Sequence, residues 1–170
     1  MTTTMPSPLR VRSTVPSDRV MRLVNPIVAA ILRSPFHRLL SRHVLLLTYT
    51  GRKTGRQFTI PVGYTREGDT LTVFSGHHVW WKNLRGGAPV AVYLEGRQRT
   101  AHAELIEDRA GLLSAVEGYV ARFGLKGAGQ RIGLALDTQP PLSRDDLAAA
   151  LEGHAVVYLS LVARPDGGET

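Results

Sequence analysis

The amino-acid sequence predicts an α+β fold, a small antiparallel barrel of about six strands with flanking helices. Short β-type segments follow one another through the middle of the chain, and helical patterns are concentrated towards its two ends. Strands joined by tight turns pair antiparallel, and most of these segments lack the crossover helix that a parallel sheet requires. A chain of 170 residues suits one domain. We expect that domain at residues 17–164, between a flexible basic arm (1–16) and a short tail (165–170).

The first predicted element is a helix over residues 17–33, which begins at a polar pair suited to N-capping. Apolar residues recur on one face and arginines on the other, and Pro26 should kink the helix. The apolar face consists of Val20, Val24, Ile27 and Ile31. Either this helix packs on the core of its own domain, or it contacts a membrane or covers a ligand. A short second helix is predicted for Pro35–Arg42.

Six strands are predicted after these helices. They are His43–Thr50, Gln57–Thr65, Thr70–Ser75, Ala88–Leu94, Arg97–Glu107 and Ala155–Leu161. The first contains a continuous apolar run, which is typical of a strand buried on both faces. The second alternates, with Tyr64 on its apolar side and Pro61 and Gly63 on the other. Turns are expected at residues 67–69 and, between two hairpin strands, at residues 95–96.

Helical segments are predicted between and after the strands. A short one covers His78–Arg85 and ends at a glycine pair. A longer one follows the N-cap Asp108, and its apolar face consists of Leu112, Val116, Tyr119, Val120 and Phe123. The pattern from Lys126 to Asp137 contains several glycines and is ambiguous. Ser143 opens a last short helix that ends near Leu151, through a sequence that resembles a capping box.

Charge is distributed unevenly along the chain. The net charge is +7, but residues 1–60 hold ten basic residues and one acid, for a local charge of +9. Such an excess indicates an anionic partner, which could be a nucleic acid, a membrane surface or a charged small molecule. The absence of cysteine excludes thiolate catalysis and cysteine-ligated metal sites. No apolar run is long enough to span a membrane, so we expect a cytoplasmic protein, with peripheral membrane contact through residues 17–42 left open.

The densest basic cluster is the predicted loop between the first two strands, residues 50–56. Two glycines allow a tight turn, and Arg52, Lys53 and Arg56 project three cations from it. Such a loop can bind a phosphate or carboxylate through charge-assisted hydrogen bonds. Its spacing differs from a Walker A loop, and a strand rather than a helix follows it. The alternative is a polar hairpin loop that is basic for solubility.

A second cluster surrounds the two tryptophans, Trp80 and Trp81. Neighbouring helical residues point about 100° apart, so one ring can enter the core while the other lines a cleft. Asn83 lies one helical turn after Trp80, and an amide beside an aromatic plane suits a flat heterocycle. His77 and His78 are adjacent and lack a helical His-x₃-His spacing or a nearby carboxylate, so no metal site is predicted.

These motifs, taken in order, resemble the deazaflavin (F420)-dependent nitroreductases and the F420H2-dependent quinone reductases. The resemblance covers residues 35–107 and, more faintly, the last strand. Its motifs are Leu45–Arg56, Ile60–Val62, Gly68–Asp69, Trp80–Leu84 and Ala88–Val90. It implies a split barrel of the FMN-binding type and the cofactor coenzyme F420, a flat deazaflavin with a phosphodiester and an oligoglutamate tail.

The resemblance also implies roles for residues of this chain. The basic loop would bind the phosphate and tail, while Pro61, Gly63 and Ser75 would flank the ring beside Trp80 and Asn83. The complete expected cofactor-binding set is Arg52, Lys53, Thr54, Gly55, Arg56, Pro61, Gly63, Ser75, Trp80, Lys82 and Asn83.

The expected activity is hydride transfer from reduced F420 to a small organic acceptor, which could be a quinone, an enone or a nitroaromatic. No catalytic residue is assigned. Tyr49, Tyr64, His77 and His78 are candidate proton donors. A second hypothesis is a barrel that binds FMN, haem or a lipid, with or without catalysis. A nucleic-acid-binding module is a third, disfavoured by the low aromatic content and the absence of a recognisable motif. A homodimer is compatible with each of them.

Overall fold

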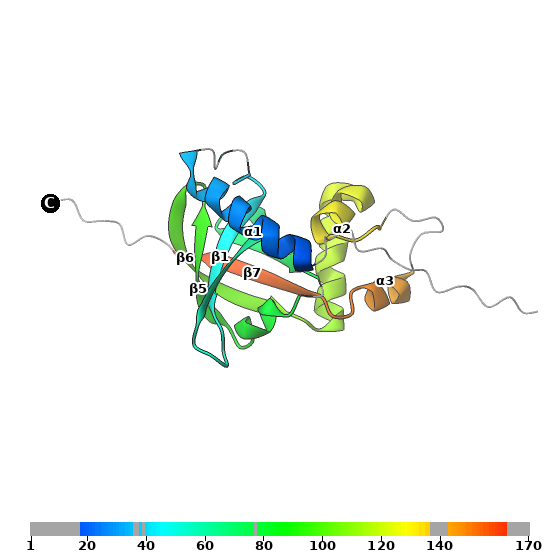
Figure 1. Ribbon diagram of the computed structural model, residues 1–170. Coiled ribbons are helices and arrows are strands. Elements are labelled where there is room, and N and C mark those ends of the chain that lie inside the picture. Colours follow the sequence, from blue (N-terminus) through cyan, green and yellow to red (C-terminus); the bar gives the residue numbers. More distant parts are fainter. Residues whose placement is uncertain (1–17, 36–37, 39, 77, 137–142, 163–170) are drawn as a thin grey trace, which may run out of the picture.

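Seven strands form one curled antiparallel sheet in the computed structural model (Figure 1). They are β1 (Val44–Thr50), β2 (Gln57–Gly63), β3 (Thr65–Glu67), β4 (Thr70–Ser75), β5 (Ala88–Leu94), β6 (Arg97–Ile106) and β7 (Ala155–Leu161). Their order in the sheet is β2-β1-β5-β6-β7-β4-β3. The predicted α+β class and antiparallel barrel are therefore confirmed, and all six predicted strands are present.

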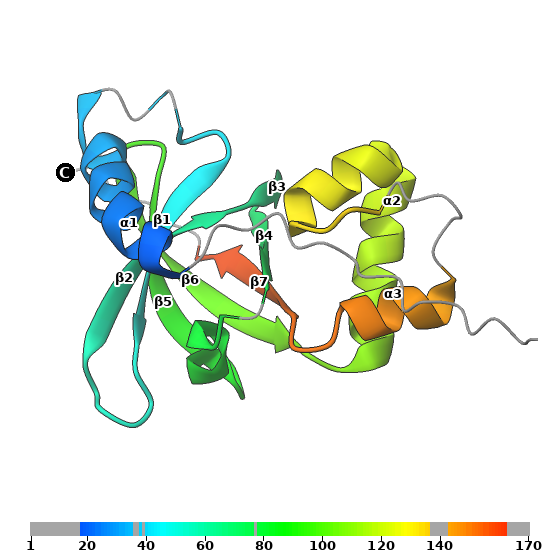
Figure 2. The ribbon, with the colours of Figure 1, turned by 45° about the vertical axis from the view of Figure 1, so that its right-hand side comes forward.

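The structure describes residues 18–35, 38, 40–76, 78–136 and 143–162. The predicted arm (1–16), the tail (165–170), Ser17 and His77 lie outside these residues. Three helices flank the sheet, namely α1 (Asp18–Arg33), α2 (Arg109–Ile132) and α3 (Arg144–Ala150). Figure 2 shows α1 on one side of the sheet, near β1 and β2, and α2 and α3 on the other, near β4 and β7.

The seventh strand arises because the chain bends at Tyr64. Before the bend β2 pairs with β1, and after it β3 pairs with β4, at the opposite edge of the sheet. The amide of Tyr64 donates to the His43 carbonyl (2.9 Å), and its hydroxyl donates to the Ser41 carbonyl (2.6 Å). One continuous segment thus supplies both edges, which curls the sheet into a split barrel. The seam is open between β2 and the end of β4.

The barrel interior holds the main core. Alternate residues of each strand point inward, and on β2 these are Ile60 and Val62, while Pro61 and Gly63 face outward, as the alternation predicted. A second core lies outside the barrel, between the sheet and helices α2 and α3, around Val116 and Val156. Burial on both faces explains why the β7 sequence is almost continuously apolar.

Turns and caps follow the sequence closely. The β5–β6 hairpin turns at Glu95 and Gly96, which both have positive φ, as a type I′ turn requires. Asp108 caps α2 by accepting from the Gly111 amide (2.8 Å), and Ser143 forms a reciprocal capping box with Asp146. The ambiguous segment Lys126–Asp137 is helical up to Ile132 and non-helical over residues 133–136. This helical part belongs to α2. It is separated from the first part of α2 by a non-helical residue, Gly124 (φ 69°).

The buried face of the N-terminal helix differs from the predicted one. Leu32, 1% exposed, is buried, whereas Ile27 of the predicted apolar face is 61% exposed. Contacts with β1 and β2 therefore determine which face of α1 is buried, and the apolar pattern alone does not identify it.

The predicted helix Pro35–Arg42 is not an α-helix where the structure describes it, since residues 35 and 38 are in 3₁₀ conformation and residues 40–43 form a turn. Within the described residues, no helix has both the length and the apolar character needed to cross a bilayer.

Replacing Tyr64 by phenylalanine tests the importance of the bend. The Ser41 carbonyl would lose its phenolic donor inside the protein, so we expect Tyr64→Phe to lower the free energy of unfolding by about 1–3 kcal/mol. Chemical denaturation measures this change. Tyr93→Phe is the matched control, since among the described residues the Tyr93 hydroxyl makes no hydrogen bond, and its effect should stay within about 0.5 kcal/mol. Equal effects of the two substitutions would contradict this role of Tyr64.

Candidate functional site

The basic loop between β1 and β2 is a compact, hydrogen-bonded turn. The Gly51 amide donates to the Arg56 carbonyl and the Gly55 amide to the Gly51 carbonyl, both at 2.8 Å. Gly55 has a φ of 65°, which favours glycine. A β-carbon at Gly51 would approach the Phe58 ring to 2.8 Å. The loop's geometry therefore favours glycine at both positions, and the loop presents its side chains from a defined backbone.

The loop is fastened to the short 3₁₀ helix η2 (Trp80–Leu84). The side chain of Asn83 accepts from the Arg52 amide (3.0 Å) and donates to the Trp80 carbonyl (2.8 Å). The Arg52 guanidinium donates to the Arg85 carbonyl at the end of η2 (3.1 Å). Three residues of the expected set, Arg52, Trp80 and Asn83, are thus connected. The Asn83 amide, however, is hydrogen-bonded to two backbone groups of the protein itself.

The loop's cations lack acidic partners. Among the described residues, Arg52, Lys53 and Arg56 form no ion pair, and all three are exposed. The Thr54 hydroxyl accepts from the Arg56 amide (3.3 Å). Lys82, on η2, is also exposed, with its Nζ 5.5 Å from the Trp81 ring centroid. Such uncompensated cations on a fixed backbone favour an anionic ligand.

The two tryptophans behave differently. Trp81 is buried, at 4% exposure, and its indole N–H has no partner among the described residues. Trp80 is half-buried and packs against the barrel core. Its ring lies 5.9 Å from that of Tyr49, which stacks on Phe58 at 5.7 Å. One ring therefore fills the core, as predicted, and the other covers the edge of the core beside the basic loop.

The residues expected to flank a ring lie along the seam of the barrel. Pro61 and Gly63 lie on the outer face of β2, whereas Ser75 lies at the end of β4 on its inward-facing side. β2 and β4 approach each other across the seam. Ser75 is 3% exposed, and its hydroxyl has no hydrogen-bond partner among the described residues. An orphaned buried hydroxyl beside two unpaired strand edges is a polar position that a ligand in the seam could use.

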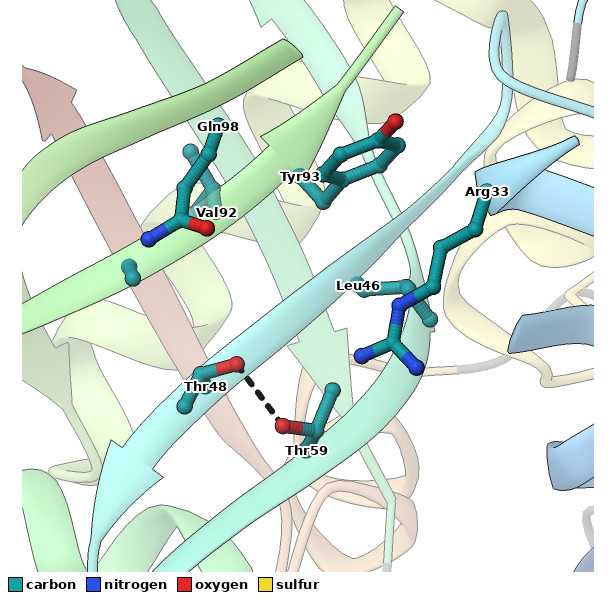
Figure 3. A pocket seen from close by; sticks show the side chains of 8 residues that line it. Arg33, Leu46, Thr48, Thr59, Val92, Tyr93 and Gln98 are labelled. Carbon is teal, nitrogen blue, oxygen red and sulfur yellow. Dashed lines mark hydrogen bonds between the residues drawn. The ribbon is translucent and has the colours of Figure 1, made fainter. Parts of the chain in front are cut away.

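A pocket of about 310 Å³ lies on the outer face of the sheet, next to the strands that carry the loop (Figure 3). Thr48 and Thr59, hydrogen-bonded to each other at 2.8 Å, lie on its floor, and Arg33 reaches over it from the end of α1. The remaining lining residues are Leu46, Ala91, Val92, Tyr93 and Gln98. Hydroxyl, amide and guanidinium groups around a small apolar surface suit a polar organic ligand.

A larger pocket, of about 550 Å³, lies further along β2 and includes Gly63 in its wall. Its other side is formed by α2, with Tyr119 and Arg131. Sequence reasoning missed this pocket, because α2 is far from β2 in the chain and nothing in its pattern distinguishes lining residues from exposed ones. Burial raises the pKa of Tyr119 above its ordinary value of 10.0, so its hydroxyl stays protonated at neutral pH.

The candidate proton donors are differently placed. Tyr49 and Tyr64 are buried in the barrel core, and the Tyr64 hydroxyl is bound to the Ser41 carbonyl. His78 is half-buried in the segment before η2. His77 lies outside the described residues, as noted above. In the part of the chain that the structure describes, no group of three or more His, Cys, Asp or Glu side chains could hold a metal ion.

Comparison with known proteins identifies a family. The family described as F420H(2)-dependent quinone reductase matches residues 22–118, more than half of the chain. Comparison with curated proteins gives no match.

Solved structures similar to this chain include an F420 reductase (TM-score 0.41, 14% identity, covering 76% of this chain and 95% of that one). The F420-H2 dependent reductase FDR-A is another, with a TM-score of 0.40, 19% identity and coverages of 69% and 94%. HutZ, the heme storage protein from Vibrio cholerae, is a third, with a TM-score of 0.46, 15% identity and coverages of 78% and 92%.

Substitution of Asn83 tests how the loop is held. Asn83→Leu removes both side-chain hydrogen bonds, so we expect the Arg52 amide to exchange its hydrogen about tenfold faster or more. Hydrogen exchange followed by NMR measures this rate. Asn83→Asp keeps an acceptor for the Arg52 amide and should stay near the wild-type rate. An unchanged rate in Asn83→Leu would show that the loop is held by other contacts.

Proposed function

Because this chain belongs to the F420H(2)-dependent quinone reductase family and is an F420-dependent oxidoreductase, we propose that it reduces a small organic acceptor by hydride transfer. The observation that carries the proposal is the basic loop. Arg52, Lys53 and Arg56 extend from a backbone that is fixed by its own hydrogen bonds and by Asn83, and no acid among the described residues neutralises them.

The residues present fit the chemistry of coenzyme F420. Its phosphodiester and oligoglutamate tail are anionic, and three exposed guanidinium and ammonium groups are a matching donor set. Its ring is flat and has polar edges, and the seam offers the orphaned Ser75 hydroxyl together with the exposed backbone of Gly63. We therefore assign the tail to Lys53 and Arg56 and the ring to the seam beside Pro61, Gly63 and Ser75.

The protein's own contribution is binding and orientation. When bound in its reduced form, F420 supplies a hydride. The loop would hold the anionic end, so that the position of the ring along β2 follows from the strand's fixed geometry. Trp80 and Asn83, both half-buried, would support the loop from the η2 side, since Asn83 connects η2 to the Arg52 amide. Placing the ring against a packed sheet keeps water from one of its faces.

The acceptor is proposed to be a quinone, with enones and nitroaromatics as related alternatives. The family description favours a quinone. A quinone takes up a hydride and a proton, so a proton donor near the seam is also required. Tyr119, which sequence reasoning did not include, is a candidate donor. It lines the pocket whose wall contains Gly63, and its hydroxyl contacts Thr65.

Other hypotheses stay as predictions with weaker support. The mononucleotide FMN would need fewer cations than the loop offers, and so would haem or a lipid. Peripheral membrane contact through residues 17–42 has one supporting observation, the exposed Ile27 on α1 beside basic residues. Homodimer formation and a cytoplasmic location have no observation of their own. Nucleic-acid binding is disfavoured by the placement of most aromatic rings within the two cores.

The decisive experiment is a fluorescence titration of the protein with F420 and, separately, with FMN. Arg52 also holds the loop on η2, so the sharper variant changes Lys53 and Arg56 to alanine. Each charge-assisted contact contributes about 1.5–3 kcal/mol, so the F420 dissociation constant should rise more than tenfold. Arg97→Ala is the control, since Arg97 is an exposed arginine with no ion pair among the described residues, next to a different turn.

Two outcomes would contradict this assignment. Unchanged F420 affinity in the double variant would exclude the loop as the tail site. FMN binding as tight as F420 binding in the wild-type protein would favour the mononucleotide hypothesis instead.

A further inference from the structure

The larger pocket carries an unusual concentration of arginines. It is lined by residues at the Tyr64 bend, by residues of β3 and β4, and by residues of α2 between Tyr119 and Arg131. Arg42, Arg66, Arg122 and Arg131 line it, and they come from three stretches of the chain, because the last two both lie on α2. Among the residues that the structure describes, no aspartate or glutamate belongs to the lining. Four guanidinium groups around one cavity of about 550 Å³ raise the local positive potential, because like charges reinforce each other there.

Existing partners neutralise these cations only in part. Arg66 lies 3.5 Å from Glu95, and Arg122 is paired with Glu67, but all four side chains of these pairs are at least 37% exposed. Exposed ion pairs are weak and exchange readily for a better anion. Arg42 and Arg131 form no ion pair among the described residues. An anion in the pocket would therefore meet two cations without any anionic partner.

Aromatic rings form one wall and hold two of the arginines in place. The guanidinium carbon of Arg131 lies 4.0 Å from the centroid of the Phe123 ring, and that of Arg122 lies 4.9 Å from it. Arg131 also donates to the Gly127 carbonyl (2.9 Å). Tyr119 packs edge-to-face on Phe123 at 5.4 Å. Guanidinium groups positioned in this way lose little side-chain entropy on binding a planar anionic group.

We propose that this pocket binds the acceptor as an organic anion, a flat aromatic or quinoid ring that carries a carboxylate or sulfonate. The arginines would hold the acidic group, and the wall of Tyr119 and Phe123 would contact the ring. This inference rests on the proposed function, because Gly63 belongs both to this pocket and to the expected ring site.

Two further observations separate the pocket from the tail site. Arg122, Phe123 and Arg131 lie beyond residue 118, where the family match ends, so these contacts belong to this chain's own C-terminal part. The basic loop is at the opposite end of β2, about 20 Å from Gly63, counting six residues at about 3.3 Å each. The loop's cations therefore do not reach the pocket, and an anionic acceptor and an anionic tail need not compete.

The test is a direct binding measurement on the full chain without cofactor. Isothermal titration calorimetry would compare 1,4-naphthoquinone-2-sulfonate with neutral 1,4-naphthoquinone. We expect the sulfonate to bind at least tenfold more tightly and its affinity to fall with added salt. The double variant Arg122→Gln/Arg131→Gln should lose at least tenfold of the sulfonate's affinity and little of the neutral quinone's. Lys126→Gln, which removes one charge from the same helix outside the pocket, should leave both unchanged.

A third variant tests the pocket without changing any residue of α2. Arg42→Gln removes a pocket cation that makes no hydrogen bond or ion pair within the described residues, so its fold should be unaffected and its sulfonate affinity reduced. Equal binding of the two quinones, or sulfonate binding unaffected by all three arginine changes, overturns the proposal. So does a variant that weakens F420 binding instead, since the pocket would then hold the cofactor's tail. Arginine-dependent sulfonate binding in a protein that fails to bind F420 would support the pocket and refute the proposed function alone.

Discussion

The bend at Tyr64 is the constraint on which the rest of the molecule depends. The segment from Gln57 to Glu67 pairs with β1 before the bend and with β4 after it, so a single stretch of chain supplies both edges of the sheet. The two hydrogen bonds of Tyr64, to the carbonyls of His43 and Ser41, fix that change of direction. Because the sheet curls around this point, a seam opens between β2 and β4, with Gly63 and Ser75 on either side of it.

Positive charge is organised around the same strand. At one end of β2, Lys53 and Arg56 extend from a loop that Asn83 ties to η2. At the other end, Gly63 adjoins a pocket lined by four arginines, two of which come from α2. The acids that pair with them lie at exposed positions. Of the ten basic residues within residues 1–60, three lie in the loop and one, Arg42, lines this pocket, so the pocket draws most of its charge from later parts of the chain.

Local patterns predicted most of the secondary structure, because turns and caps depend on a few neighbouring residues. Glu95-Gly96 adopts the positive φ values of a tight hairpin turn, and Ser143 forms the capping box that its spacing indicated. Differences arose where distant packing decides. Ile27 fits the apolar face of α1 by period, yet it is exposed, whereas Leu32, outside that predicted face, is buried. Residues 126–132 contain glycines that weaken a helical pattern, but burial of Ala128 and Ile132 keeps them helical.

For the candidate site, the sequence by itself determined the form of the loop, since two glycines and three cations within residues 51–56 already specify a tight turn that presents positive charge. It also determined that Pro61 and Gly63 face away from the core, because strand alternation depends only on backbone geometry. The tertiary structure alone decided that Asn83 fastens this loop and that the Ser75 hydroxyl faces inward at the seam, without a hydrogen-bond partner in the described part of the chain. It alone brought Arg42 and Arg131 to one pocket. Those two residues are far apart in the sequence, and only closure of the barrel and docking of α2 onto β4 place them together.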